Sequence, residues 1–469
     1  MKNFLTFMTV LFLTVSTSIG QVFQVDTLQY HGDVDKYINV VVMGDGYTSS
    51  QQENFKRDAT NLLNYIFSQT PWSNYIRFFN FFAIKVVSSQ SGTKHPNTAS
   101  DCKNTSPLVP ISNPNTYLGC TFDAYGIHRL IVPQNISNVV EVLAKNFPNY
   151  DQAFVIANSP YYGGSGGYYA TSTTDLKSPE VSAHELGHSF ANLADEYYAG
   201  DGYLTEKPNL TQQTNTALVK WTNWIGHNKI GLYKYCCGGQ SASWYRPHSN
   251  CKMQFLGQQY CSVCTEAIIE KIHSLVNTIV SYTPTILTIN SPNQYLDFKL
   301  TGLMKPVPNT LKIVWNLDDV PTLHNVDSIQ IDQNTLSIGP HTLTATVFDT
   351  TALIRVNNHS AIHFSTVTWS IDKLITGLEL KSHTNKISCS VFPNPATNFL
   401  NIEFELEKKS EVSIQLISLD GKAIKQIENK AVESGKYSNT FNIENLSLGS
   451  YTLVFKIDNT TFSHTIVKQ

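Results

Sequence analysis

Hydrophobic positions follow two different patterns along this chain of 469 residues. Up to about residue 282, continuous hydrophobic runs alternate with segments whose hydrophobic residues recur every three or four positions. The runs predict buried strands, and the three-to-four spacing predicts amphipathic helices. Beyond that point, short segments rich in Thr, Val and Ile alternate hydrophobic with polar residues, and turn residues separate them. That pattern is typical of antiparallel sheets.

The first region, residues 21–282, is expected to be an α/β domain in which helices pack on a mixed sheet. The hydrophobic runs predict strands at 37–43, 78–87, 127–132 and 152–157. The helical spacing predicts helices at 49–67, 139–146, 178–192 and 265–276.

Two β units are expected after this region. Residues 283–373 have the short strands and frequent turns of an Ig-like β-sandwich. A polar linker is expected at 374–389, and residues 390–469 have the pattern of a further β-sandwich. Within this last unit, Asp420-Gly421 predicts a hairpin turn.

Residues 1–20 have the three parts of a secretory signal peptide: Lys2, a hydrophobic run at 4–15 and a small-x-small cleavage site at 18–20. A membrane anchor is the competing interpretation, but the run is shorter than the about 20 apolar residues of a spanning helix. No later segment is long and apolar enough to span a bilayer, so no transmembrane segment is expected in the mature chain. The net charge of −3 gives no reason to expect nucleic acid or an acidic membrane surface as a partner.

Seven of the eight cysteines precede residue 270. In an exported chain we expect disulfides rather than free thiols, with Cys102–Cys120 as a local bridge. Cys261-x-x-Cys264 is also interpreted as disulfide-bonded, and a metal knuckle or redox pair is the alternative. Because this count is odd, one thiol is left over, and Cys236 and Cys237 are the candidates. That thiol is either unpaired or paired with the distant Cys389.

The candidate chemistry concentrates in Ala183–Tyr198, AHELGHSFANLADEYY. His184 and His188 are four residues apart, so on a helix both imidazoles project from one face and can hold one zinc ion. Zinc lowers the pKa of water, and Glu185 beside the two histidines can act as the general base and return the proton to the leaving amine. The motif therefore predicts a zinc hydrolase, most specifically a peptidase.

A catalytic zinc ion takes three protein ligands. In the metzincin pattern H-E-x-x-H-x-x-G-x-x-H, Gly ends the helix and the third His follows three residues later. Here those two positions are Ala191 and Ala194. One residue further on, Asn192 can adopt the left-handed conformation that ends a helix, and Asp195 follows three residues later. We therefore expect Asp195 as third ligand, with Glu196 as the competing candidate and otherwise a residue that supports the ligands.

Two further parts of such a site have candidates nearby. Met253, in a turn next to a cysteine, is expected as the methionine beneath the metal, and a space-filling core methionine is the alternative. The donor for the oxyanion stays unassigned, because Phe255 stands where some metzincins have Tyr. Its candidates are Tyr197, Tyr198, Tyr245 and His248.

The Gly-rich segment 161–171, YYGGSGGYYAT, has two interpretations. It is a flexible turn, because Gly-rich strands are weak. Alternatively, it is an exposed edge beside the motif helix, to which a peptide substrate can bind by strand addition.

These motifs together give the chain a resemblance to the IgA-peptidase family of zinc metallopeptidases. The matching segments are VVVMGDGYT (40–48), FVIANSPYYGGSGG (154–167), HELGHSFANLADEYY (184–198) and CKMQFLGQQYCSVC (251–264). The resemblance implies His184, His188 and Asp195 as metal residues and Glu185 as catalyst, without implying that immunoglobulin is the substrate. Members often carry an extra N-terminal domain, and the short segment after residue 20 leads us to expect none here, nor a folded inhibitory pro-region.

Residues 390–469 resemble a type IX secretion C-terminal sorting domain of Bacteroidetes. The matching segments are VFPNPA (391–396), DGK (420–422) and LGSY (448–451). The resemblance implies export by the type IX secretion machinery, followed by release or attachment to the outer-membrane surface.

The leading hypothesis is thus a secreted zinc endopeptidase that acts on extracellular proteins or peptides. The alternative is a surface adhesin or binding protein that carries an inactive metallopeptidase fold, and the intact Glu185 argues against it. A zinc hydrolase of another class is a third hypothesis, which the Gly-rich segment weakens.

Overall fold

The computed structural model describes residues 22–167, 169–236, 238–373, 387–418 and 421–469. The chain forms two compact units, Met1–Asp372 and Lys373–Gln469. The expected signal peptide, most of the expected linker and Asp420 of the expected hairpin turn lie outside the described residues. Within the described residues, no helix has the length and apolar character needed to cross a membrane.

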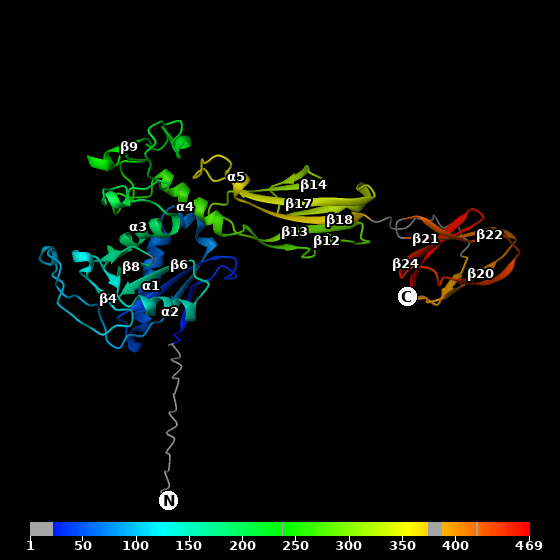
Figure 1. Ribbon diagram of the computed structural model, residues 1–469, viewed down its shortest axis with the longest axis horizontal. Helices are drawn as coiled ribbons and strands as arrows, with labels where there is room; N and C mark the ends of the chain where they lie inside the picture. Colours follow the sequence, from blue (N-terminus) through cyan, green and yellow to red (C-terminus); the bar gives the residue numbers. More distant parts are fainter. Residues whose placement is uncertain (1–21, 168, 237, 374–386, 419–420) are drawn as a thin grey trace, which may run out of the picture. The chain divides into compact units, whose positions relative to one another are not determined.

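A six-stranded mixed sheet organises the first part of the first unit (Figure 1). In spatial order its strands are β1 (Val25–Gln29), β3 (Phe79–Ile84), β2 (Ile38–Asp45), β6 (Gln152–Ala157), β8 (Ala170–Thr173) and β7 (Gly164–Ser165). The four central strands are parallel, and the edge strands β1 and β7 run antiparallel to their neighbours. The central strands are buried on both faces, which explains their continuous hydrophobic runs.

Helices cover both faces of this sheet. One hydrophobic core includes Val40 and Val42 of β2, and it also holds α1 (Gln52–Phe67), α3 (Ser178–Ala191) and α4 (Ser262–Leu275). The other core includes Val41 and Met43 of the same strand and holds α2 (Ile136–Asn146). Alternate residues of one strand therefore serve opposite layers, as the pleat of a strand requires.

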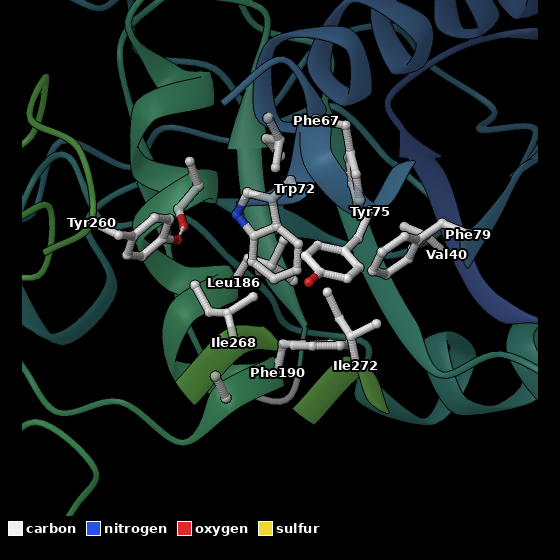
Figure 2. Packing of buried hydrophobic residues seen from close by; sticks show 14 of the residues in the cluster. Val40, Phe67, Trp72, Tyr75, Phe79, Leu186, Phe190, Tyr260, Ile268 and Ile272 are labelled. Atoms are coloured by element: carbon white, nitrogen blue, oxygen red, sulfur yellow. Dashed lines mark hydrogen bonds between the residues drawn. The ribbon is translucent and has the colours of Figure 1, made fainter. Parts of the chain in front are cut away.

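Trp72 lies at the centre of the core that supports α3 (Figure 2). Its ring centroid lies 5.6 Å from that of Phe67 in α1 and 5.2 Å from that of Phe190 in α3. Ile268 and Ile272 of α4 belong to the same fully buried cluster. Aromatic packing of this extent fixes the position of α3 on the sheet.

Seven of the eight elements predicted for the first region are present, with small shifts of their ends. The strand predicted at 127–132 is wrong. Residues 124–126 form a short 3₁₀ turn, and only Val132–Pro133 (β5) pairs, with Cys120–Thr121 (β4). The chain turns here because Asp123 and Tyr125 have positive φ angles of 66° and 54°, and the side chain of Asp123 bonds that of His128 across the turn.

Short elements fill the rest of the first region, including β9 (Tyr233–Lys234) and β10 (Tyr245–Arg246), which pair with each other.

The remainder of the first unit consists of two sheets and the short helix α5 (His359–Ile362). One sheet has the order β11 (Ile279–Thr283), β13 (Tyr295–Leu303) and β16 (Ser328–Asp332). The other has the order β12 (Thr288–Ile289), β18 (Phe364–Lys373), β17 (Gly339–Asp349), β14 (Leu311–Leu317) and β15 (Val320–His324). Residues of both sheets share one core, in which the rings of Trp315 and Trp369 stack 5.9 Å apart.

The second unit also contains two sheets around one core. The first has the order β19 (Cys389–Phe392), β20 (Phe399–Leu406) and β23 (Gly435–Asn442). The second has the order β22 (Ala423–Val432), β21 (Ser410–Ser418), β24 (Gly449–Ile457) and β25 (Thr460–Lys468). The C-terminal part of the chain is therefore rich in β-sheet, as predicted.

Candidate metal centre

Helix α3 carries the His-Glu-x-x-His segment and ends where the sequence predicts. Asn192 caps it in the left-handed conformation, with φ 54° and ψ 34°. The Asn192 N–H donates to His188 O at 3.0 Å, and the Leu193 N–H donates to Gly187 O at 3.1 Å. This Schellman-type ending reverses the chain, so that Asp195 returns to the face of the helix that carries the histidines.

Three potential ligand atoms meet at that face. His184 Nε2 lies 3.0 Å from Asp195 Oδ1, and His188 Nε2 lies 3.2 Å from the same oxygen. The two Nε2 atoms are 3.1 Å apart. Tetrahedral zinc with bonds of about 2.0–2.1 Å places neighbouring nitrogen and oxygen ligands about 3.3 Å apart. His184 is buried, whereas His188 and Asp195 are partly exposed, so the group opens toward solvent on one side.

The second nitrogen of each imidazole is bonded to a backbone carbonyl. His184 Nδ1 lies 3.0 Å from Lys252 O, and His188 Nδ1 lies 2.7 Å from Leu193 O. A carbonyl can only accept, so Nδ1 of each ring donates to its carbonyl, and Nε2 is the nitrogen that faces Asp195 and is placed to bind a metal. Carbonyl partners of this kind orient histidines that bind metal. The donor set therefore fits a zinc ion.

Glu185 projects beside these ligand atoms and against the sheet edge. Its Oε2 lies 4.0 Å from His188 Nε2. A Cβ added at Gly166 would lie 1.8 Å from the same Oε2, so a side chain at this position would displace the carboxylate. Gly166 directly follows β7, the edge strand at this side of the sheet. The Gly-rich segment thus brings backbone into close approach with the carboxylate.

Burial and nearby charges shift the pKa values of Glu185 and Asp195 in opposite directions. Burial raises the pKa of Glu185, and the nearby histidines offset only part of that effect. Burial would also raise the pKa of Asp195, but hydrogen bonds from His184 and His188 outweigh it and hold that pKa well below its usual range. Asp195 is therefore ionised and Glu185 is the more basic carboxylate.

The loop that contains Met253 lies directly beneath α3. Met253 is fully buried, and a Cβ added at Gly187 would lie 2.8 Å from its Sδ. The neighbouring Lys252 is 1% exposed, and its Nζ lies 2.8 Å from Glu180 Oε2 in the first turn of α3. This buried ion pair joins α3 to the loop whose Lys252 carbonyl orients His184.

Glu196 points away from the histidines into a buried group of cysteines. Its Oε1 lies 3.2 Å from Cys264 Sγ and 3.0 Å from Asn209 Nδ2, and its N–H donates to Met253 O at 2.7 Å. Cys251 and Cys261 complete a cluster whose potential ligand atoms all lie within 4.8 Å of one another. Of the two acidic candidates, Asp195 therefore reaches the histidines, and Glu196 holds the Met253 loop from behind.

The expected disulfides are not confirmed. Cys102, Cys120, Cys251, Cys261 and Cys264 are free thiols, and Cys102 lies against Asp123 and His128 rather than bridged to Cys120. The Sγ atoms of Cys251 and Cys264 are 3.7 Å apart, which is well beyond the about 2.05 Å of an S–S bond. Cys237 lies outside the described residues. The prediction of disulfides rested on export and on the other cysteines nearby, and neither identifies the His, Asp and Glu residues that these thiols contact.

One of the four oxyanion candidates lies at the site. The Tyr197 ring lies over His184, with centroids 6.3 Å apart. Burial raises the pKa of Tyr197, and the charges of Asp195 and Glu185 raise it further.

The contacts of the other candidates lie elsewhere. The Tyr198 hydroxyl is bonded to Asp201 at 3.2 Å, and His248 Nδ1 accepts from the Asn250 N–H at 3.0 Å. Tyr245 belongs to β10, where its N–H donates to Thr211 O.

The sequence analysis missed Arg129. Its positive charge acts on both Glu185 and Tyr197. Its carbonyl accepts from the Gly164 N–H of β7 at 3.0 Å. The residue stands in a loop about 55 positions before the motif, and no spacing rule links the two.

Comparisons with solved structures give weak likenesses only. Dimeric latent PorU from Porphyromonas gingivalis is 12% identical, with 40% of this chain and 20% of that chain covered and a TM-score of 0.16. The fibronectin(III)-like modules of Clostridium thermocellum CbhA are 13% identical, with 40% and 94% covered and a TM-score of 0.15. TM-scores this low do not establish a shared fold. No curated protein sequence matches the chain.

Two family models match separate parts of the chain. Residues 390–469 match the secretion system C-terminal sorting domain, which marks proteins exported by the type IX secretion system of Bacteroidetes. Residues 27–234 match IgA Peptidase M64, and this stretch contains the complete His-Glu-x-x-His segment and Asp195. Both resemblances expected from the sequence are thus found: one part of the chain matches the M64 peptidase model and another part matches the sorting-domain model.

Proposed function

We propose that this protein is a secreted zinc-dependent endopeptidase with a metzincin-like active site. The observation that supports it most is the convergence of three ligand atoms, His184 Nε2, His188 Nε2 and Asp195 Oδ1, within 3.0–3.2 Å of one another. The Nδ1 atoms of both imidazoles are already bonded to carbonyls. A helix with a purely structural role does not require an ionised carboxylate beside the two Nε2 atoms as well. These three residues would hold the zinc ion, which supplies a Lewis acid for water and for the peptide carbonyl.

Glu185 would act as general base and then as general acid. It takes a proton from the attacking water and returns that proton to the leaving amine. Because burial raises the pKa of its carboxyl, Glu185 is a stronger base than an exposed glutamate. Gly166 keeps the space beside Glu185 open, since any side chain there would occupy the position of the carboxylate.

Tyr197 would donate a hydrogen bond to the oxygen that gains charge during the reaction. Its raised pKa keeps the phenol protonated at neutral pH, which a donor requires. The positive charge of Arg129 acts on the same position and favours a developing negative charge.

The edge strand β7 gives the site a means of binding an extended peptide. β7 is the last strand of the sheet and pairs with β8 on one side; on its outer side the Gly164 N–H donates to the Arg129 carbonyl, so a substrate would use the edge at Gly166. A substrate strand added there would run past Gly166 and therefore past Glu185. This arrangement favours a polypeptide substrate over a small ester or amide.

The decisive test compares wild-type protein with Glu185→Ala for bound zinc and for cleavage of an unfolded protein substrate. We expect the variant to keep its zinc and to lose at least about 10²-fold in cleavage rate, because Glu185 is not a ligand. Wild-type protein without zinc, or a variant that cleaves at the wild-type rate, would show the proposal to be wrong.

The ligand assignment is tested separately with Asp195→Ala and Glu196→Ala. We expect Asp195→Ala to lose the zinc that activity requires and Glu196→Ala to keep it, because only Asp195 reaches the histidines. The reverse result would assign the third ligand to Glu196.

A further inference from the structure

The segment between β3 and α2 contains little regular secondary structure that could hold it in place. Across residues 85–135, which are all described, the only strands are β4 and β5, of two residues each. Loops longer than about 12–15 residues without their own secondary structure are uncommon and need a specific reason for their order. At the centre of this segment lies a buried group of four side chains, His95, Cys102, Asp123 and His128.

The four side chains direct one potential ligand atom each toward a common point. Cys102 Sγ lies 3.3 Å from Asp123 Oδ1, 3.4 Å from His128 Nδ1 and 3.7 Å from His95 Nε2. Asp123 Oδ1 lies 2.8 Å from His128 Nδ1 and 3.6 Å from His95 Nε2. Tetrahedral zinc separates nitrogen and oxygen ligands by about 3.3 Å, and sulfur from either by about 3.6 Å. The Asp123–His128 pair at 2.8 Å has to lengthen most to admit the ion, and the sulfur distances of 3.3 Å and 3.4 Å have to lengthen slightly.

The remaining polar atoms of the group are largely engaged outside it. His95 Nδ1 lies 3.0 Å from Pro110 O, so it carries the proton and leaves Nε2 as the free lone pair. Asp123 Oδ2 accepts from the Thr98 N–H at 2.7 Å. Outer contacts of this kind orient metal ligands and fix which atom faces the ion.

A hydrogen-bonded group without metal accounts for only part of this arrangement. Asp123 Oδ1 can accept a hydrogen bond from both Cys102 Sγ and His128 Nδ1. That arrangement leaves His95 Nε2 with Asp123 Oδ1 at 3.6 Å and Cys102 Sγ at 3.7 Å as the atoms of the group nearest to it, which is too far for a good hydrogen bond. The four residues are 1%, 5%, 7% and 1% exposed, in chain order, so water cannot readily supply the missing bonds.

We infer that His95, Cys102, Asp123 and His128 bind a second zinc ion with a structural role. Four protein ligands in a closed, buried setting are characteristic of structural zinc, whereas catalytic zinc keeps a position open. Thiolate and imidazole donors are also the ligands that favour zinc over calcium or magnesium.

This ion would stabilise the loop that supports the substrate edge. His128 immediately precedes Arg129, whose carbonyl accepts from the Gly164 N–H of β7 at 3.0 Å. The Ser165 hydroxyl of β7 donates to the carbonyl of Ile131. The second zinc would therefore fix both β7 and Arg129 while lying outside the group of His184, His188 and Asp195.

Zinc content of the full chain tests the inference directly. Cys102→Ser removes the one thiolate of the group with little change of volume. Cys120→Ser is the matched control, because Cys120 is also a buried free thiol of this segment and lies outside the group. We expect Cys102→Ser to contain one zinc per chain fewer than wild-type protein and Cys120→Ser to contain the same number. Equal zinc in folded Cys102→Ser and wild-type protein would overturn the inference.

A measurement on the unaltered group covers the case in which Cys102→Ser does not fold. Trypsin is applied to the Glu185→Gln protein, which keeps all four residues and lacks the base for self-cleavage. Prolonged treatment with EDTA is expected to raise the rate of cleavage after Lys94 and Lys103 by about tenfold or more, and added zinc is expected to reverse it. If neither EDTA nor added zinc changes the rate of cleavage at these two lysines, the inference is overturned.

Discussion

Two of the groups of potential metal ligands in the first region differ in number of members, exposure and surroundings. The group of His184, His188 and Asp195 has three members, two of them partly exposed, with a basic carboxylate and a sheet edge beside it. The second group, His95, Cys102, Asp123 and His128, has four members, all buried, and the Asp101 carboxylate beside it is engaged by the His128 N–H at 2.9 Å. The same kinds of side chain thus form an open group in one place and a closed group in the other.

The difference shows that ligand count and access assign the role, rather than the presence of His and Asp alone. An open fourth position admits water and substrate, and a nearby base gives that position a chemical use. A closed set of four leaves no position for substrate, so its contribution is to the free energy of folding. The open group also follows a helical motif, whereas the closed group joins distant positions of a loop.

Chelation is expected to give the largest effect, because it should remove zinc from the two groups at different rates. A mild chelator is expected to remove the exposed ion first and to reduce peptidase activity to background, while the loop 85–135 stays resistant to trypsin. The physical reason is that His188 and Asp195 are reachable from solvent and the closed group is not. Zinc content, activity and trypsin sensitivity followed together over time provide the measurement. Simultaneous loss of activity and trypsin resistance would contradict the distinction between an exposed ion and an enclosed ion.

Tyr197→Phe tests whether the Tyr197 hydroxyl donates a hydrogen bond during catalysis at the open group. Loss of a donor to the developing oxyanion is expected to lower kcat by about 10²–10³-fold without changing zinc content. Tyr198→Phe is the matched control, because its hydroxyl is bonded to Asp201 at 3.2 Å, and it should retain nearly full activity. Steady-state kinetics on one peptide substrate distinguish the two. Equal effects of both substitutions would rule out a special role for Tyr197.

Glu180→Gln tests the support beneath the open group and should have the smallest effect. The substitution leaves the buried ammonium of Lys252 without its counter-charge, and we expect a loss of up to about 3 kcal/mol in the free energy of unfolding. Zinc affinity should fall by about tenfold, because the Lys252 carbonyl orients His184. Glu53→Gln, which breaks an exposed pair with Lys85, is the control and should change neither quantity.

The same pair predicts a dependence of stability on pH. Burial by itself would raise the pKa of Glu180, but its bonds to Lys252, Tyr65 and the Gly257 N–H outweigh burial and lower that pKa. A lowered folded-state pKa adds stability above the ordinary carboxyl range, and this contribution is lost as pH falls through the lowered value. Urea unfolding between neutral and acidic pH should therefore show a smaller difference between wild type and Glu180→Gln at low pH. A difference that is constant with pH would contradict this assignment.

The parts of the fold that depend on local pattern could be predicted from the sequence. Continuous hydrophobic runs identify β2, β3 and β6, because these strands are buried on both faces. Asn192 indicates the end of α3, because few residues other than glycine accept its left-handed conformation. Asp195 then follows from the position of that ending.

Contacts between distant segments could not be predicted in the same way. The strand expected at 127–132 fails because the bond between Asp123 and His128 turns the chain, and hydrophobicity gives no sign of it. Arg129 reaches the active-site group from a loop, and Glu196 meets cysteines of a later segment. The disulfide expectation is not confirmed, and the reason is similar: an oxidising compartment favours a bridge but does not identify which side chains face each thiol.

Anomalous diffraction at the zinc absorption edge, from crystals of the zinc-loaded full chain, tests the central claim most directly. We predict one peak in contact with His184 Nε2, His188 Nε2 and Asp195 Oδ1, beside Glu185, and a separate peak enclosed by His95, Cys102, Asp123 and His128. A map with no peak at the first position would contradict the assignment of this group as a zinc peptidase site.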